Sequence, residues 1–360
     1  MKHRLVGLTA MLLVLPVVCL AETNNLTKLP IVRIGIARDG PSIRFPANVD
    51  LFKREIVDLT SGEFDVRFPL DKTIHGSWTI AGVKRAVDLL LADPEVDLIV
   101  ALGPNVSNEV LQRRSFPKPV IAPIVIDAEL QGVPLKDGTS GVKNLTYINS
   151  FTSFDRDMKA FLEVVRFRRL AVLVGSLALE SVPSLRQKVR RVGFEYTIDI
   201  EIVPVDTSSE EALDALPPGT DAVYVTPLLR FTPTEFEKLV SGLIERNLPS
   251  FSMWGRDEVE TGILAGVAPR SDFQRLARRV ALDVQSILLG EDAGLLEVAF
   301  PRGSELTINM ATARAIGVYP PWKVLTEAEP LNEAVEDIER RYTLDSAVRE
   351  AIAANLDLAA

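Results

Sequence analysis

The sequence predicts an α/β fold with two doubly wound, Rossmann-like lobes, and three observations support this prediction. Short apolar runs alternate with amphipathic stretches along most of the 360 residues. Several of the runs, such as DLIVAL at 97–102 and VIAPIVI at 120–126, are apolar without interruption, which is typical of strands buried on both faces of a parallel sheet. The alternation begins a second time after residues 139–153, so we expect two such sheets in series.

The first series of elements is expected between residues 31 and 126. Apolar residues three or four positions apart, such as Val83, Val87 and Leu90, predict a helix over 79–91. A second helix is expected to begin near Glu109. The other elements expected in this part are a helix at 49–59 and strands at 31–37, 64–68, 97–102 and 120–126.

The second series is expected between residues 154 and 290, where Gly290 ends a long helix. The expected helices cover 154–165, 182–192, 234–245 and 272–289, and the expected strands cover 170–174, 197–203, 222–225 and 250–253. We assign to the first lobe residues 30–147 and about 268–300, to the second lobe 148–267 and about 301–326, and to an acidic helical tail 327–360.

The first 21 residues have the pattern of a secretory signal peptide. Lys2 and Arg4 precede an apolar stretch at 5–18, and a small-x-small cleavage pattern ends at Ala21. The apolar stretch is shorter than the about 20 residues that a membrane-spanning helix needs. A lipoprotein anchored through Cys19 is the less favoured alternative, because a bulky valine stands where such sites have a small residue.

Composition argues against several classes of protein. A net charge of −9 disfavours a nucleic-acid partner, since phosphate groups are bound by clusters of Lys and Arg. One Cys and two His disfavour a disulfide framework and a thiolate or multi-histidine metal site. The sequence has no phosphate-binding loop, no GxSxG motif and no glycine fingerprint after its first expected strand. We therefore expect no cofactor, no metal and no enzymatic activity.

Candidate site residues follow the expected strands, because ligands of doubly wound sheets bind at the carboxyl ends of the strands. Gly103, Asn105 and Ser107 lie where a strand leads into a helix, and a helix N-terminus favours an anionic group such as a carboxylate. The alternative is that Asn105 or Ser107 only caps that helix. Arg38 and Asp39 follow the first strand, and Arg38 is suited either to a ligand carboxylate or to an ion pair.

Aromatic and polar residues in the remaining loops complete the candidate site. Trp78 and Trp254 lie in loops of different lobes, where they are suited to enclose an apolar or aromatic ligand. Packing in the core is the alternative for each of them. Asp127, Ser176 and Thr226 stand in further loops that follow expected strands.

Two stretches of the sequence resemble the type I periplasmic substrate-binding proteins of ABC transporters, of the tryptophan/tyrosine-receptor kind. They are SFSMWGRDEVETGILAGVAPRSDFQRLARRVALDVQSILLGE at 250–291 and INMATARAIGVYPP at 308–321. DLIVALG at 97–103 and KPVIAPI at 118–124 fit the same family. The resemblance spans about 31–329 and implies a periplasmic protein that captures a small ligand by hinge closure and presents it to an ABC permease. GSLAL at 175–179 and TPLL at 226–229 are more apolar than the family's loops. This difference argues against an amino-acid ligand and favours a more hydrophobic or unusual ligand, or reduced binding.

The last 34 residues differ from the rest in charge. Residues 327–360 contain nine Asp and Glu against three Arg, a net charge of −6. Within them, YTLDSAVREAIAANLDLAA at 342–360 resembles the opening helix of TolC-like outer-membrane efflux proteins. This resemblance implies an alternative function, a ligand-sensing or adaptor module fused to, or working with, an efflux channel. A solvated acidic helix is the other interpretation of this segment.

Overall fold

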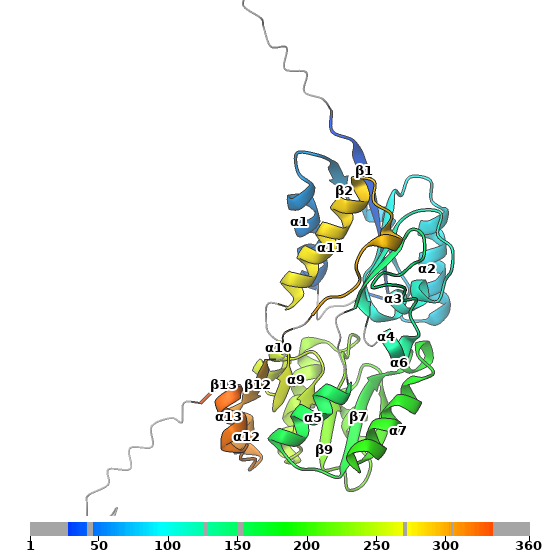
Figure 1. Cartoon of the computed structure of the whole chain (residues 1–360). Helices are drawn as coiled ribbons and strands as arrows, with labels where there is room; N and C mark the ends of the chain where they lie inside the picture. Colours follow the sequence, from blue (N-terminus) through cyan, green and yellow to red (C-terminus); the bar gives the residue numbers. More distant parts are fainter. Residues whose placement is uncertain are drawn as a thin grey trace, which may run out of the picture.

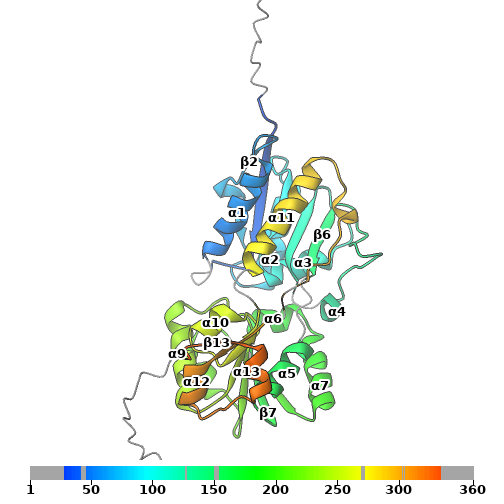
Figure 2. The ribbon, with the colours of Figure 1, turned by 60° about the vertical axis from the view of Figure 1, so that its left-hand side comes forward.

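The computed structural model describes residues 28–41, 46–125, 128–149, 154–268, 272–301, 303 and 305–333. The predicted signal peptide with Cys19, the candidate site residue Asp127 and the tail from residue 334 onward lie outside these ranges. Figure 1 shows the chain, and Figure 2 shows two lobes stacked one above the other. Each lobe is a sheet with helices on both faces.

Lobe 1 contains a six-stranded sheet whose strand pairs are all parallel. The strand order is β2-β1-β4-β5-β6, and β3 also pairs with β1. The strands are β1 (Ile31–Arg38), β2 (Asp65–Arg67), β3 (Thr73–His75), β4 (Leu98–Ala101), β5 (Val120–Val125) and β6 (Leu145–Asn149).

Successive residues of a strand point to opposite faces of the sheet, and in lobe 1 the residues on both faces are apolar. Helices therefore cover both faces of this sheet. Ile34 and Ile36 of β1 pack with α1 (Pro46–Thr60) and α11 (Asp272–Leu288). Ala37 packs on the opposite face with α2 (Ile80–Ala92) and α3 (Pro104–Leu111). The short helices α4 (Ala128–Gln131), η1 (Leu70–Lys72) and η2 (Ala293–Leu295) complete the lobe.

Lobe 2 contains a seven-stranded sheet in the order β13-β12-β11-β10-β9-β7-β8. All its pairs are parallel except β11 with β12. The strands are β7 (Arg169–Gly175), β8 (Asp199–Val205), β9 (Ala222–Val225), β10 (Ser250–Ser252), β11 (Ala265–Val267), β12 (Leu306–Asn309) and β13 (Glu329–Leu331).

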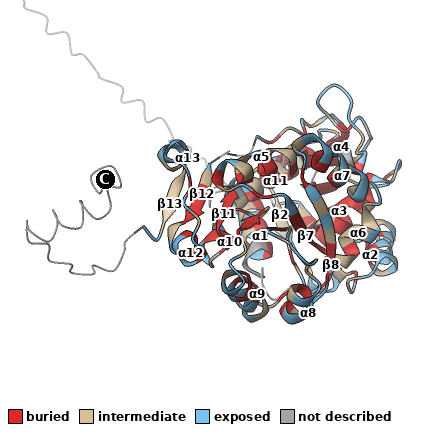
Figure 3. Ribbon diagram, turned by 90° about the horizontal axis from the view of Figure 1, so that it is seen from below, coloured by how far each residue is buried: buried red, intermediate tan, exposed pale blue. Residues whose placement is uncertain are grey.

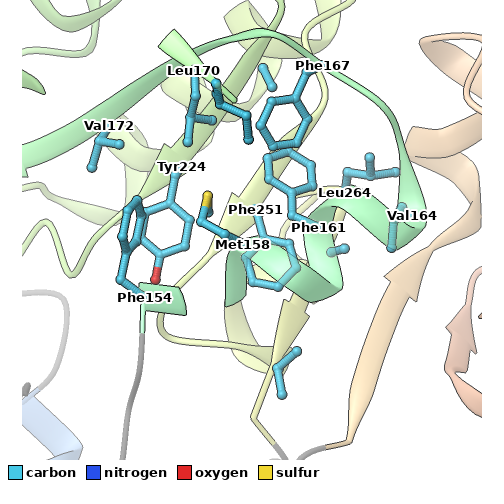
Figure 4. Packing of buried hydrophobic residues seen from close by; sticks show 14 of the residues in the cluster. Phe154, Met158, Phe161, Val164, Phe167, Leu170, Val172, Tyr224, Phe251 and Leu264 are labelled. Carbon is cyan, nitrogen blue, oxygen red and sulfur yellow. The ribbon is translucent and has the colours of Figure 1, made fainter. Parts of the chain in front are cut away.

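One face of the lobe 2 sheet carries an aromatic core. Phe161 lies 5.1 Å from Phe251, and Tyr224 stacks on Phe251 at 6.0 Å between ring centroids (Figure 4). The Tyr224 hydroxyl donates to Asp157 at 2.7 Å, so this buried polar atom has a partner. The helices that pack on this face are α5 (Phe154–Val164), α7 (Leu185–Tyr196), α12 (Met310–Ala315) and α13 (Trp322–Glu327).

The other face of the sheet is covered by α8 (Ser209–Asp214) and α9 (Pro233–Glu245), whose apolar residues meet β7, β8 and β9. Two short helices, α6 (Ser176–Ser181) and α10 (Arg256–Glu260), follow β7 and β10. Figure 3 shows that buried residues lie in the interior and that the outer faces of the helices are exposed, while the edge strand β13 is of intermediate burial. No helix in the described ranges is long and apolar enough to cross a membrane.

The chain passes between the lobes more than once. After β11 of lobe 2, α11 packs beside α1 of lobe 1 (Figure 1), and β12 then returns to the lobe 2 sheet. Lobe 1 is therefore built from two separate segments of the chain.

The structure corrects three boundaries expected from the sequence. The helix expected to begin near Glu109 begins at Pro104, because a proline at the first helical position is preorganised for a helix start. Residues 139–153, expected to divide the two series, contain β6. Glu329–Leu331, assigned to the acidic tail, is strand β13 and pairs with β12, so the sheet continues past residue 327.

Candidate functional site

Two adjoining hollows lie between the lobes. We call them the α6 hollow, which α6 borders, and the Arg38 hollow, which Arg38 borders. Trp78 and Pro104 of lobe 1 and Pro227 and Leu229 of lobe 2 border both hollows. Since loops at the carboxyl ends of both sheets supply these residues, we treat the two hollows together as one cleft.

Eight of the ten predicted site residues border this cleft. Asn105, Ser176 and Thr226 border the α6 hollow, Arg38, Asp39, Gly103 and Trp254 border the Arg38 hollow, and Trp78 borders both. Ser107 does not border either: it is buried inside α3, and its hydroxyl donates to the Ala101 carbonyl at 2.9 Å. Asp127 lies outside the described residues.

The N-terminus of α3 binds a carboxylate of the protein itself. Asp39 Oδ1 accepts from the Val106 backbone N–H at 2.7 Å. Asp39 Oδ2 accepts from the Asn105 side chain at 2.8 Å and from the Asn105 backbone N–H at 3.2 Å. The position before the helix is Gly103, which has no side chain to cap it. Neither Asn105 nor Ser107 therefore caps α3, as the sequence had allowed, because both lie within its first turn.

The Asp39 side chain is deeply buried. Its side chain is 3% exposed, and burial raises the pKa of the Asp39 carboxyl, while its hydrogen bonds with Val106 and Asn105 act in the opposite direction. A Cβ atom at position 103 would lie 2.6 Å from Asp39 Oδ1. Glycine at 103 thus leaves the room that the buried carboxylate occupies.

Trp78 is held against Gly40 at the border of both hollows. Its backbone has a φ of 56°, and its N–H donates to the Asp39 carbonyl at 2.9 Å. A Cβ atom at position 40 would lie 2.4 Å from the Trp78 indole, so only glycine permits this close approach. The ring is thereby fixed where it borders both hollows.

The aromatic partner of Trp254 comes from the other lobe. The ring stacks on Phe273 of α11 with 4.8 Å between centroids and 28° between planes. Trp78 and Trp254 border the same hollow. Phe273 was not predicted from the sequence, because it is one apolar residue at the start of a long amphipathic helix.

The two arginines that border the cleft have acidic side chains near them. Burial lowers the pKa of Arg38, and the nearby Asp39 and Asp50 carboxylates oppose that change. Burial and the Arg38 charge also lower the pKa of His75, which pairs with Arg38 across β3 and β1. In the α6 hollow, Arg230 forms a 2.6 Å ion pair with Asp206.

The wall of the α6 hollow is mainly apolar. Helix α6, which follows β7, places Leu177 and Ala178 against it, and the loop that follows β9 adds Leu228 and Leu229. The Thr226 hydroxyl is directed to the Leu173 carbonyl at 2.9 Å. Such a surface is suited to the apolar body of a small molecule.

Hydrogen bonds join the lobes beside the α6 hollow, where Figure 2 shows α6 at the junction. Asn108 of α3 donates to the Ser181 carbonyl of α6 at 2.8 Å and accepts from Gln131 at 3.1 Å. The Ser181 hydroxyl lies 2.9 Å from Asn105 Oδ1 and 2.8 Å from the Leu177 carbonyl oxygen. Its single proton is therefore shared between two acceptors.

The described residues contain no cluster of three or more His, Cys, Asp or Glu that could hold a metal ion. A scan against protein-family models and a search of curated proteins both give no match.

Solved structures share the fold. A conserved domain protein from Vibrio cholerae O1 biovar El Tor has a TM-score of 0.67 and 16% identity, over 83% of this chain and 99% of that one. An ABC domain in complex with L-Trp from Streptococcus pneumoniae has a TM-score of 0.65 and 19% identity, over 83% and 99%. The ligand-free, open structure of a substrate-binding protein with adhesive properties from Clostridium difficile has a TM-score of 0.51 and 16% identity, over 83% and 99%.

These similarities confirm the predicted fold class: the chain has the two-lobed fold of type I periplasmic binding proteins. The structures named here do not show the resemblance of residues 342–360 to TolC-like proteins, and those residues lie outside the described ranges.

Proposed function

We propose that this chain is a solute-binding protein that captures a small, apolar or aromatic ligand between its lobes. The observation that carries the proposal is the composition of the cleft, because both lobes contribute apolar surface to one continuous site. Trp78 and Pro104 of lobe 1 face the site together with Pro227 and Leu229 of lobe 2. A pocket of this kind is the usual form of a small-molecule site.

Hinge closure is the mechanism that this geometry supports. A ligand that contacts both lobes stabilises the arrangement in which they approach, because an open arrangement loses the contacts with one lobe. The bonds of Asn108 and Ser181 act in the same direction, since they join α3 to α6. Ligand and protein contacts together set the balance between open and closed arrangements.

Presentation of the ligand to an ABC permease follows as part of the proposal. The sequence resemblance implies it, and the solved structures of this fold include an ABC domain with bound L-Trp and a substrate-binding protein. The signal peptide predicted at 1–21 would place the mature protein in the periplasm, where such a permease takes up its ligand. An alkaline phosphatase fusion to the signal peptide tests export, and inactivity of the fusion would argue against this location.

An adaptor that senses a ligand for an outer-membrane efflux channel is a second candidate. The resemblance of 342–360 to TolC-like proteins favours it. Neighbouring genes distinguish the two roles: permease and ATPase genes favour uptake, whereas membrane-fusion and inner-membrane pump genes favour efflux.

The decisive experiment is mass spectrometry of small molecules that co-purify with the protein, repeated with a variant whose cleft is blocked. Ala178→Trp places a large side chain in the α6 hollow and should abolish co-purification. Ala215→Trp, at an exposed position on the end of α8, is the matched control and should retain it. Equal recovery from both variants would contradict a ligand site in this cleft. Any ligand found is then assayed for turnover, which would contradict the expectation that the protein is not an enzyme.

A further inference from the structure

Asp39 occupies a position that a ligand carboxylate would otherwise take. Helix N-termini bind anions through free backbone N–H groups, and this one stands at the border of the cleft. Here the N–H groups of Asn105 and Val106, with the Asn105 side-chain amide, all donate to Asp39. The backbone N–H groups of Asn105 and Val106 are therefore both engaged by one buried carboxyl group. The anion site of α3 is therefore filled from within the protein.

The cations at the described part of the cleft are also balanced by acidic neighbours. Arg230 is paired with Asp206 at 2.6 Å. Arg38 lies beside Asp39 itself and near Asp50, and both carboxylates act on its charge. A ligand carboxylate that approached α3 would find these N–H groups already donated to Asp39, and any negative charge on Asp39 would repel it.

We propose that Asp39 is a specificity-determining residue, a built-in carboxylate that fills the α3 N-terminus and selects ligands whose end at α3 is uncharged. This inference rests on the proposed function and makes its ligand class narrower. The favoured ligand is an apolar or aromatic molecule with a neutral polar end, such as an amide or an alcohol. The corresponding carboxylic acid is excluded by Asp39.

Matched acid and amide probes test the inference. The full chain, freed of co-purified ligand by partial unfolding and refolding, is titrated calorimetrically with indole-3-acetate and indole-3-acetamide, phenylacetate and phenylacetamide, and octanoate and octanamide. In the wild type, the bound amides should be favoured over their acids by at least about tenfold. In Asp39→Ala, the freed N–H groups at 105 and 106 become available to the acid, so this preference should fall by about tenfold or reverse.

Asp71→Asn is the matched control, because it removes an equal charge from a lobe 1 side chain that is 72% exposed. It should keep the wild-type preference. Should Asp39→Ala fail to fold, Asp39→Asn removes the same charge while keeping an acceptor for Val106.

The outcomes separate the inference from the proposed function. Wild-type protein that binds the acids as tightly as the amides would overturn the inference and leave ligand binding intact. A preference unchanged in both Asp39 variants would overturn it as well. Acid binding that is lost in Arg38→Gln would assign carboxylate recognition to Arg38 instead. Failure of all six probes to bind would count against an apolar or aromatic ligand, and so against the proposed function itself.

Discussion

Asn108 on α3 of lobe 1 donates its side-chain amide to the backbone carbonyl of Ser181 on α6 of lobe 2 at 2.8 Å. The same side chain accepts from Gln131 at 3.1 Å, so both of its polar atoms are used. Because Asn108 is only 6% exposed, water does not readily replace these bonds. This contact couples the positions of the two lobes.

Asn108→Asp should weaken the closed arrangement of the lobes. The substitution keeps the shape of the side chain but places an oxygen against the Ser181 carbonyl, at a cost of about 1–3 kcal/mol. Small-angle X-ray scattering should show a larger radius of gyration, and ligand affinity should fall because closure becomes less favourable. Asn247→Asp, at an exposed position, makes the same charge change and should alter neither quantity. An unchanged scattering profile for Asn108→Asp would show that this bond does not hold the lobes together.

The Trp254–Phe273 stack should contribute a second coupling between the lobes. A double-mutant cycle with Trp254→Ala and Phe273→Leu should give an interaction energy of about 0.5–1.5 kcal/mol, the range for aromatic pairs. Urea unfolding of the wild type, the single variants and the double variant measures it. Trp322→Ala serves as a control, because Trp322 is 80% exposed and its loss should change stability by less than about 0.5 kcal/mol. Additive effects of the two cleft substitutions would contradict the coupling.

The helices and strands that could be predicted are those whose burial leaves a pattern of apolar residues in the local sequence. The central strands β4, β5 and β9 are uninterrupted apolar runs, and α2 shows helical spacing, so both types of element can be recognised from the sequence. Five strands were not predicted: β3, β6, β11, β12 and β13. Strands β3 and β13 have three residues each, all partly buried, and neither forms an apolar run. Their place in the sheets depends on pairing with strands distant in the sequence.

The sequence predicted where the candidate site lies better than it predicted which contacts the site residues make. Loops after parallel strands meet at one edge of a sheet, which is why eight predicted residues border the cleft. The role of Asp39 could not be predicted, because its partners lie 66 and 67 positions away. The same holds for Phe273, whose contact with Trp254 depends on the return of α11 to lobe 1.

Gly40→Ala should disturb the cleft. The new Cβ would lie 2.4 Å from the Trp78 indole, so the ring must move from the border of both hollows. We expect a loss of stability of about 1–3 kcal/mol, a change in tryptophan fluorescence and weaker ligand binding. Gly175→Ala is the matched control within the α6 hollow, because nothing lies within 4 Å of its added Cβ. Similar losses in both variants would show that close packing at Gly40 is not the cause.

Asp283 on α11 should make the protein less stable at neutral pH than at mildly acidic pH. Burial raises the pKa of its carboxyl from 3.8 to about 6, although the hydrogen bond from Arg279 at 2.9 Å opposes the change. Its Oδ2 atom has no hydrogen-bond partner among the described residues. The folded protein therefore takes up a proton at a higher pH than the unfolded chain. Above pH 6 the folded state bears the full cost of the buried charge, and the cost is relieved as the pH falls from 6 towards 4.

Asp283→Asn should remove the free-energy cost of the buried carboxylate charge. At pH 7.5 the free energy of unfolding should rise by about 1–3 kcal/mol, and at pH 4 it should differ little from that of the wild type. Urea unfolding at the two pH values measures both quantities. Glu235→Gln is a control of opposite sign, because Lys238 and Ser209 lower the pKa of Glu235 to about 2. That variant should be less stable than the wild type at pH 7.5, with a difference that shrinks as the pH falls below 4.5. A loss of stability in Asp283→Asn at pH 7.5 would mean that the ion pair with Arg279 outweighs the burial of the charge.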